Sequence, residues 1–200
     1  MSGRVAVLAS GAGSNLQAIL DDPVCAPAVA LVVSDRAEAK ALDRARSAGV
    51  AAVHLDPADH PSRQEHDSAL LELLRRERID IVCLAGYMRI VGPELVREYW
   101  GRMLNVHPSL LPAFPGARAV RDALAWGAKV TGCTVHLVDE EVDHGPIVAQ
   151  EVVPILEDDD ESSLHARIQE AEHRMYPASL RLLLEGRLRI EGRRVLVGDA

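Results

Sequence analysis

An asparagine and a histidine two residues apart form the densest group of potentially reactive side chains in the sequence. Asn105 and His107 stand at the end of the apolar run 103–106. Alternate residues of a strand point to one face, so both side chains would be presented together. An amide and an imidazole can each donate a hydrogen bond to an oxygen that becomes negative, and an imidazole can also move a proton near neutral pH. The pair suits acyl transfer, although a lone buried histidine is more often a core residue with all its hydrogen bonds made within the protein.

A glycine-bearing turn at residues 10–15 is the second candidate site. It follows a short apolar run and precedes a helical pattern, so its backbone N–H groups and the helix N-terminus could bind a phosphate. The turn lacks the lysine of a P-loop, and Leu16 occupies the place of the third glycine in a dinucleotide fingerprint. Asp35 keeps a dinucleotide interpretation open, and a plain turn with Ser14 or Asn15 as the helix N-cap is an equal alternative.

The elements that must position these residues alternate between strand and helix. Short apolar runs predict strands buried on both faces, with amphipathic helices between them. The predicted strands are 4–9, 28–34, 51–55, 79–84 and 103–106, and the predicted helices are 15–20, 37–48, 62–76 and 93–99. This alternation predicts an α/β fold, a Rossmann-like three-layer sandwich with a mostly parallel sheet.

The pattern changes in the second half of the chain. A short helix at 119–126 is followed by strands at 130–137 and 147–154, which should be antiparallel because no helix separates them. A helix at 163–185 is expected to kink or break at Pro177. A hairpin at 187–197 should turn at Glu191 and Gly192. There is no repeat or linker, so residues 1–200 are predicted to form a single domain.

Composition restricts the class of partner. The sequence is 48% hydrophobic and 26% charged, as is typical of globular proteins, and its net charge of −8 argues against a nucleic-acid surface. The first apolar run is too short for a signal peptide, and no stretch approaches a membrane span. Three widely separated cysteines without a CxxC pair are expected to be reduced thiols. We therefore expect a cytoplasmic protein with no membrane partner.

Other residues are expected to be structural. Histidines 54, 60 and 66 are not spaced as metal ligands, so no metal is expected. Trp100 and Trp126 are expected to be packing residues.

Four segments of the sequence together resemble the folate-dependent formyltransferases. They are residues 10–16 (SGAGSNL), 85–90 (AGYMRI), 105–116 (NVHPSLLPAFPG) and 143–146 (DHGP). The Asn-x-His-x-Ser-Leu-Leu-Pro core with a later Asp-x-Gly-Pro is shared by that superfamily. Within it, the serine–asparagine turn, His107-Pro108 and the length of 200 residues favour the phosphoribosylglycinamide formyltransferases. Methionyl-tRNA formyltransferase, with an extra C-terminal domain, and formyltetrahydrofolate hydrolase, with an N-terminal regulatory domain, are less similar.

The resemblance implies transfer of a formyl group from 10-formyltetrahydrofolate, as cosubstrate, to the amine of glycinamide ribonucleotide. Asn105 and His107 would bind the tetrahedral oxyanion, with His107 as proton donor, and Asp143 would stabilise the charged form of His107. A cis peptide at Leu111-Pro112 is also implied. The chain departs from the family at Arg118, where a histidine is common.

The resemblance also assigns binding residues. Those for glycinamide ribonucleotide are Gly13, Ser14, Asn15, Gln169 and Glu172. Those for the folate are Arg63, Met88, Arg89, Ile90, Val91, Asn105 and the loop residues Asp139, Glu140, Glu141, Val142 and Asp143.

Two other functions remain open from the sequence. The same histidine and aspartate could hydrolyse 10-formyltetrahydrofolate and release formate, and a noncatalytic nucleotide-binding module could use the same sheet. The phosphate turn with Gln169 and Glu172 favours transfer, because a hydrolase would not need them. Asn105 and Asp143 would have no purpose in a binding module. The sequence does not decide whether the chain forms a homodimer.

Overall fold

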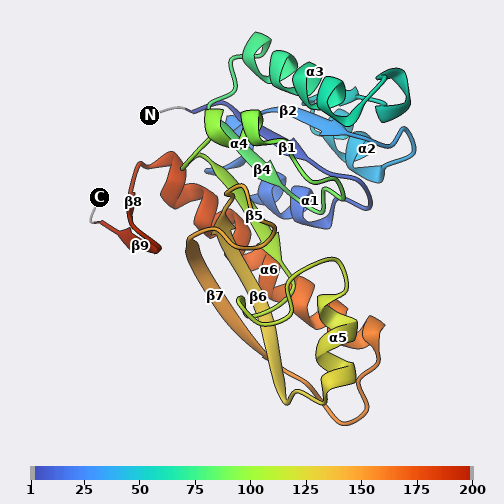
Figure 1. Ribbon diagram of the computed structural model, residues 1–200, viewed down its shortest axis with the longest axis vertical. Helices are drawn as coiled ribbons and strands as arrows, with labels where there is room; N and C mark the ends of the chain where they lie inside the picture. The colour runs from blue at the N-terminus through green and yellow to red at the C-terminus, as the bar shows by residue number, and fades with distance from the viewer. Residues whose placement is uncertain (1–2, 199–200) are drawn as a thin grey trace.

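A computed structural model describes residues 3–198, and within them nine strands form one sheet in the order β3-β2-β1-β4-β5-β6-β7-β9-β8 (Figure 1). The strands are β1 (Val5–Leu8), β2 (Val29–Ser34), β3 (Ala51–His54), β4 (Ile81–Leu84), β5 (Met103–His107), β6 (Val130–Leu137), β7 (Ile147–Pro154), β8 (Leu188–Glu191) and β9 (Arg194–Val197). The α-helices are α1 (Ser14–Asp21), α2 (Lys40–Ser47), α3 (Arg63–Arg76), α4 (Pro93–Glu98), α5 (Ala119–Trp126) and α6 (Glu161–Leu184).

The first five strands are parallel, as the sequence predicts. Parallel strands end at the same edge of a sheet, which is where ligands bind in open α/β folds. The glycine turn follows β1 at this edge, and His107 is the last residue of β5. The alternation of strand and helix therefore brings both candidate sites to one edge.

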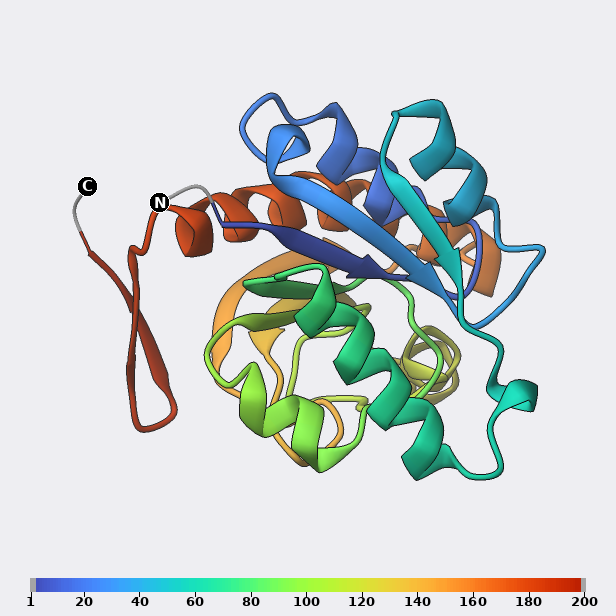
Figure 2. The ribbon, with the colours of Figure 1, turned by 90° about the horizontal axis from the view of Figure 1, so that it is seen from above.

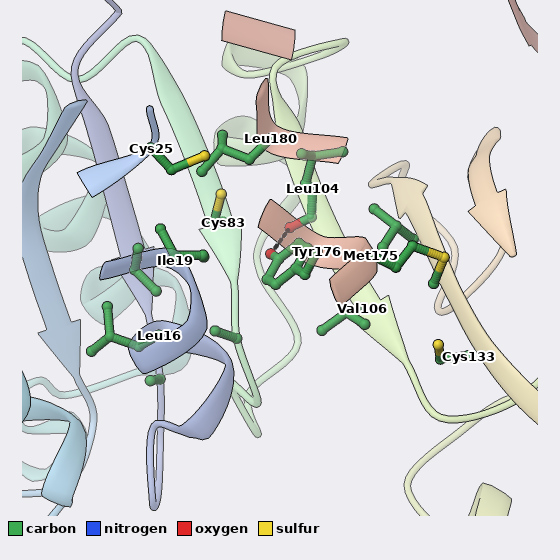
Figure 3. Close-up of a cluster of buried hydrophobic side chains, with 14 of the residues drawn as sticks. Leu16, Ile19, Cys25, Cys83, Leu104, Val106, Cys133, Met175, Tyr176 and Leu180 are labelled. Carbon is green, nitrogen blue, oxygen red and sulfur yellow. Dashed lines mark hydrogen bonds between the residues drawn. The ribbon is translucent and has the colours of Figure 1, made fainter. Parts of the chain in front are cut away.

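Helices cover both faces of the sheet, which confirms the three-layer prediction (Figure 2). Val5 and Val7 of β1 pack on the side of α1 and α6, whereas Ala6 and Leu8 pack on the side of α3 and α4. On the α6 side, the fully buried Tyr176 directs its hydroxyl hydrogen towards the Leu84 carbonyl, at 2.9 Å. The same hydroxyl lies 3.1 Å from the Leu104 carbonyl (Figure 3). This side chain ties α6 to β4 and β5, the two strands that lead into the site.

The second half of the sheet contains antiparallel pairs. β6 is antiparallel to β7, as predicted, and it is also antiparallel to β5. The predicted break at Pro177 is wrong, because α6 runs without interruption from Glu161 to Leu184. A proline removes only one hydrogen bond from a helix, and here Pro177 is buried in the packed face of a 24-residue helix that begins with a capping box at Asp160.

The expectation that the two tryptophans are packing residues is wrong. Trp126 is 83% exposed and Trp100 is 47% exposed. Trp126 is the last residue of α5, beyond the buried stretch that ends at Ala123, and Trp100 follows the end of α4. Smaller differences are a later start of α2, at Lys40, and a hairpin turn at Gly192 and Arg193.

The three cysteines, Cys25, Cys83 and Cys133, are buried and free. Burial raises the pKa of each thiol to about 12, so none is a reactive thiolate at neutral pH. Across residues 3–198, no helix is long and apolar enough to cross a membrane, and no three histidine, cysteine or acidic side chains are grouped as metal ligands.

Candidate active site

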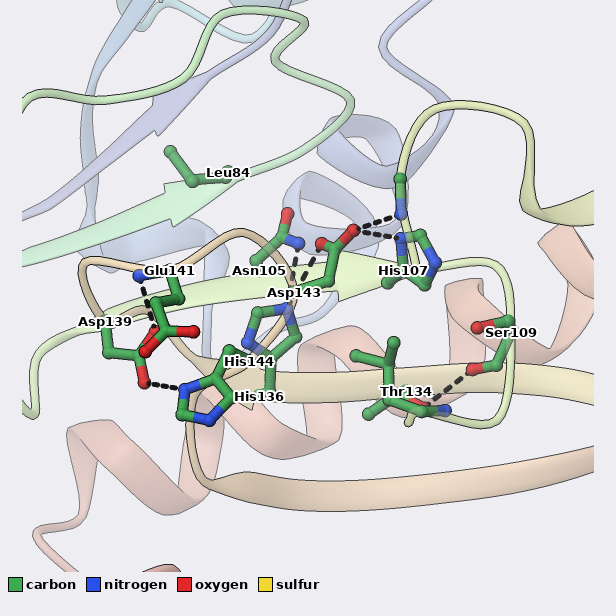
Figure 4. Close-up of polar contacts among 12 residues, drawn as sticks. Leu84, Asn105, His107, Ser109, Thr134, His136, Asp139, Glu141, Asp143 and His144 are labelled. Carbon is green, nitrogen blue, oxygen red and sulfur yellow. Dashed lines mark hydrogen bonds and ion pairs between the residues drawn. The ribbon is translucent and has the colours of Figure 1, made fainter. Parts of the chain in front are cut away.

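The candidate catalytic side chains lie where β5 and β6 pair (Figure 4). Asn105 is opposite His136, and His107 is opposite Thr134. Because side chains directly opposite on an antiparallel pair share a face, this register places two residues of β6 beside the predicted pair. His136 is a site residue that the sequence analysis missed. The sequence offered only a histidine in an alternating strand, since the pairing of β6 with β5 was not predicted.

Asp143 connects the two histidines. Its Oδ2 lies 3.4 Å from Nδ1 of His107, and its Oδ1 lies 3.8 Å from Nε2 of His136. The same Oδ2 accepts a 2.7 Å hydrogen bond from the backbone N–H of Gly116. The structure therefore brings together Asn105, His107 and Asp143, as predicted, with one carboxylate between two imidazoles.

Both ring nitrogens of His107 face oxygen atoms. Nε2 is 2.9 Å from the carbonyl oxygen of Phe114, which can only accept, so Nε2 carries a proton. Nδ1 faces the carboxylate of Asp143, at 3.4 Å. His107 is therefore held between a carbonyl that accepts from Nε2 and a carboxylate that faces Nδ1.

His136 has the opposite character. Its Nδ1 donates to the carbonyl of Leu137 at 2.9 Å, which leaves Nε2 to accept a hydrogen bond from Nδ2 of Asn105 at 3.0 Å. Burial lowers the pKa of His136, with His107 contributing in the same direction, so the ring is held neutral. A neutral His136 fixes which way the Asn105 amide is turned and leaves the second hydrogen of Nδ2 free for another acceptor.

The loop after His107 is fastened to β6 and β7. The Thr134 hydroxyl donates to the carbonyl of Ser109 at 2.7 Å and accepts from the N–H of Leu111 at 3.1 Å. Gln150 of β7 donates to the Leu111 carbonyl at 2.8 Å. The predicted cis peptide between Leu111 and Pro112 is confirmed.

The glycine turn differs from the simple N-cap alternative. Ser14 and Asn15 lie inside α1, and the cap is Gly13, in the left-handed region at φ 69° with no side-chain cap. A Cβ on Gly13 would lie 2.8 Å from the Cα of Ala41, so the close approach of the turn to α2 requires glycine. No side chain of residues 3–198 therefore accepts hydrogen bonds from the first N–H groups of α1, so these groups can donate to an anion.

Asn15 and Glu172 meet across the fold beside this turn. Nδ2 of Asn15 donates to Oε2 of Glu172 at 2.8 Å, and Oδ1 of Asn15 is buried without a partner among the described residues. Burial raises the pKa of Glu172, which is 4% exposed, although the hydrogen bond from Asn15 opposes that shift. Gln169 is half-buried one turn earlier on the same face of α6.

A groove of about 710 Å³ begins at Ser14, between α1 and α6. Three arginines line it, Arg44, Arg174 and Arg181. The Nε of Arg44 also donates to the carbonyl of Ala12, at 2.8 Å, in the glycine turn. Asp21 and Asp22 line the groove too, and Arg174 and Arg181 are paired with Glu151 and Asp22. Arg44, which contacts the turn, is therefore the cation that favours an anionic ligand there.

The residues predicted to hold the folate lie on two loops. Met88, Ile90 and Val142 are large apolar side chains that are 63%, 54% and 55% exposed. Arg63 reaches the first loop, because its guanidinium donates to the Ile90 carbonyl at 2.7 Å. Large apolar side chains that are exposed beside a site can bind a flat aromatic ligand, which would cover them.

The acidic residues of the second loop have partners within the protein. Glu140 pairs with Arg97 of α4 at 2.8 Å, and Asp139 accepts hydrogen bonds from the N–H of Glu141 and from His144. The carboxylates of Asp139 and Glu140 therefore have partners within the protein, although Glu140 is exposed, as are Glu141, Val142 and His144.

Comparison with known proteins agrees with this geometry. Residues 3–180 match the family model described as formyl transferase. The chain is 46% identical over 202 residues to phosphoribosylglycinamide formyltransferase of Mycobacterium tuberculosis, covering 98% of this chain and 94% of that protein. It is also 46% identical to the trifunctional purine biosynthetic protein adenosine-3 of Drosophila melanogaster, of which it spans only 14%.

Solved structures give the same result. Glycinamide ribonucleotide transformylase 1 from Symbiobacterium toebii superimposes with a TM-score of 0.95 at 54% identity, covering 98% of this chain and 94% of that one. A formyltetrahydrofolate deformylase from Pseudomonas syringae has a TM-score of 0.90 at 28% identity, with 100% of this chain and 67% of that one covered. The sequence match, the fold and the grouped asparagine, histidine and aspartate lead to one conclusion: this chain belongs to the formyl transferase family.

Proposed function

We propose that this chain transfers the formyl group of 10-formyltetrahydrofolate to the amine of glycinamide ribonucleotide, the phosphoribosylglycinamide formyltransferase step of purine biosynthesis. One observation carries the proposal: Asn105, His107 and Asp143 are grouped at the same sheet edge as an uncapped helix N-terminus at Gly13. The first group fits acyl transfer, and the second fits a phosphate-bearing acceptor.

In the proposed reaction the substrate amine attacks the formyl carbon. The carbon–oxygen double bond becomes a single bond to an oxyanion, which then collapses and expels the folate nitrogen. The free hydrogen of Asn105 Nδ2 donates to the oxyanion. His107 joins it and supplies the proton that the departing folate nitrogen needs once its Nε2 N–H turns from the Phe114 carbonyl to the substrate, because Nδ1 faces Asp143. The attacking nitrogen gives up one proton, which passes through solvent to His107 and replaces the proton that His107 gave to the folate nitrogen, so the proton balance closes. Asp143 faces Nδ1 of His107 and holds the ring in place.

The proposed substrate contacts follow from the same geometry. The N–H groups at Gly13, Ser14 and Asn15 bind the phosphate, while Gln169 and Glu172 hydrogen-bond the ribose and phosphate region. The folate lies against the exposed apolar side chains of the two loops, with Arg63, Arg89 and Val91 along one side and Asp139–Asp143 along the other. The acceptor and the donor thus approach Asn105 from two sides.

We further propose that residues 1–200 form one formyltransferase domain and that the reaction takes place in the cytoplasm. The continuous sheet supports the first statement, and the three free buried thiols support the second.

Mixing the enzyme with 10-formyltetrahydrofolate and following folate absorbance tests the function. The absorbance should change only after glycinamide ribonucleotide is added, and formylated product should accumulate in equal amount. A change without the ribonucleotide, with release of formate, would identify the hydrolase instead.

Inorganic sulfate should bind at the glycine turn without any substrate. The N-terminus of α1 is preformed and has no side-chain cap, so the anion meets N–H groups that already point outwards. A crystal grown in sulfate should show the ion within hydrogen-bonding distance of the N–H groups of Ser14 and Asn15. A crystal structure in which the turn is closed and only ordered water lies beside it would contradict the proposal.

Replacing Glu172 with glutamine should stabilise the free enzyme, and more so at high pH. Burial raises the pKa of Glu172 above its ordinary 4.5, so stability falls as pH rises from 4.5 through the higher pKa of the folded state. Glutamine is uncharged throughout and can still accept from Asn15. A gain of about 1 kcal/mol would raise Tm by about 2–4 °C in a protein of this size.

Thermal unfolding at pH 8 and at pH 4.5 measures this effect. The difference between Glu172→Gln and the parent enzyme should be larger at pH 8. Glu170→Gln, an exposed neighbour on α6, is the matched control and should show no such pH dependence. An equal shift at both pH values would mean that the buried carboxylate is not the cause.

A further inference from the structure

The hairpin formed by β8 and β9 carries a side chain that reaches the candidate active site. It lies beyond residues 3–180, the part of the chain that the family model matches. β9 joins the sheet beside β7, where Arg194 pairs with Ile147. The preceding residue, Arg193, donates to the backbone carbonyl of His144 and to its Nε2, the latter at 3.0 Å. The hairpin is thus attached to the loop that contains Asp143.

His144 transmits this attachment along the loop. A guanidinium can only donate, so Nε2 of His144 accepts from Arg193, and Nδ1 donates to Oδ2 of Asp139 at 2.7 Å (Figure 4). The other oxygen of Asp139 accepts from the N–H of Glu141 at 3.1 Å. A continuous series of hydrogen bonds therefore runs from the hairpin through the loop 139–145.

Asp143 takes no part in these bonds, but it precedes His144 in the loop that they span, and its backbone conformation needs support. Its φ is +53°, a region that is costly for a residue with a side chain unless the surroundings hold it. The neighbouring Gly145 has no room for a Cβ, because the Leu137 carbonyl fills that space. Held in this way, Asp143 accepts from Gly116 at 2.7 Å and faces His107.

We infer that Arg193 is a positioning residue, which holds the loop 139–145 through His144 so that Asp143 stays aligned with Gly116 and His107. The catalytic consequence rests on the proposed formyl transfer. The positioning itself does not, because every contact in it is made without substrate.

Amide hydrogen exchange in the ligand-free protein tests the positioning. The N–H of Gly116 is the reporter, since it is bonded to Asp143 and lies far from the hairpin in sequence. Arg193→Ala should speed exchange at Gly116 and at Glu141 about 3- to 10-fold, the size expected when one hydrogen-bonding group that favours the closed loop is lost. Arg189→Ala is the matched control, because Arg189 is on the same hairpin but pairs with the exposed Glu191 at 2.7 Å. Equal exchange at Gly116 in the two variants would overturn the inference.

Steady-state kinetics tests the consequence. Arg193→Ala should lower kcat by about 3- to 10-fold with little change in KM for glycinamide ribonucleotide, and Arg193→Lys, which can still donate to the His144 carbonyl, should recover part of the loss. Faster exchange with unchanged kcat would overturn the link to catalysis. If the parent enzyme itself fails to transfer formyl groups, the proposed function fails, and the exchange at Gly116 still decides whether Arg193 positions the loop.

Discussion

Asp143→Asn should lower kcat by about 10²–10⁴, the usual contribution of a positioned acid–base group. The substitution preserves shape but removes the charge that faces Nδ1 of His107 at 3.4 Å. The other nitrogen of His107 faces the Phe114 carbonyl, so without the carboxylate His107 loses its only charged partner among these contacts. The ring would then be less firmly oriented to stabilise the oxyanion and to protonate the folate nitrogen. KM for glycinamide ribonucleotide should change little, because the proposed phosphate contacts are on the glycine turn.

A double-mutant cycle and thermal unfolding distinguish this mechanism from a loss of folding. The double variant with His107→Ala should lose far less than the product of the two single losses, because the two groups act as a unit. The variant should also retain the Tm of the parent enzyme to within a few degrees. Losses that multiply in the double variant would show that Asp143 does not act through His107.

Asn105→Ala should lower kcat by about 10²–10³, the loss seen when one oxyanion donor is removed. The side chain has one hydrogen committed to His136 at 3.0 Å, and the second is the one we assign to the oxyanion. Its removal acts on the transition state, where the oxygen becomes negative, so kcat should fall more than KM rises.

Arg118→Ala is the matched comparison for Asn105→Ala. Arg118 is exposed at the N-cap of α5, in the loop where this chain departs from the family histidine. Its removal should therefore reduce kcat/KM much less than the loss of Asn105. Equal losses in the two variants would assign Arg118 a role in the reaction that its exposed position does not indicate.

Periodicity in the sequence determined which residues share a face. The alternation of apolar runs and helical patterns gave five parallel strands followed by antiparallel ones, and two strands, Val130–Leu137 and Ile147–Pro154, have the predicted bounds. The prediction that Asn105 and His107 are presented together depends on the same local rule and holds in β5. The assignment of Asp143 to the site came from the resemblance to a family motif. Local periodicity could not provide it, because it does not relate a loop residue to a strand so far away in the chain.

Apart from the pairing of β6 with β7, only the tertiary structure decided which strands are neighbours. The pairing of β5 with β6 placed His136 opposite Asn105 and made it the acceptor that orients the amide, a role that one strand considered alone cannot indicate. The continuity of α6 through Pro177 and the exposure of Trp126 were likewise set by packing against distant segments. The physical reason is the same in each case. Local sequence fixes backbone preference and side-chain direction, whereas hydrogen-bond partners, charge states and burial depend on contacts between segments that only the folded chain brings together.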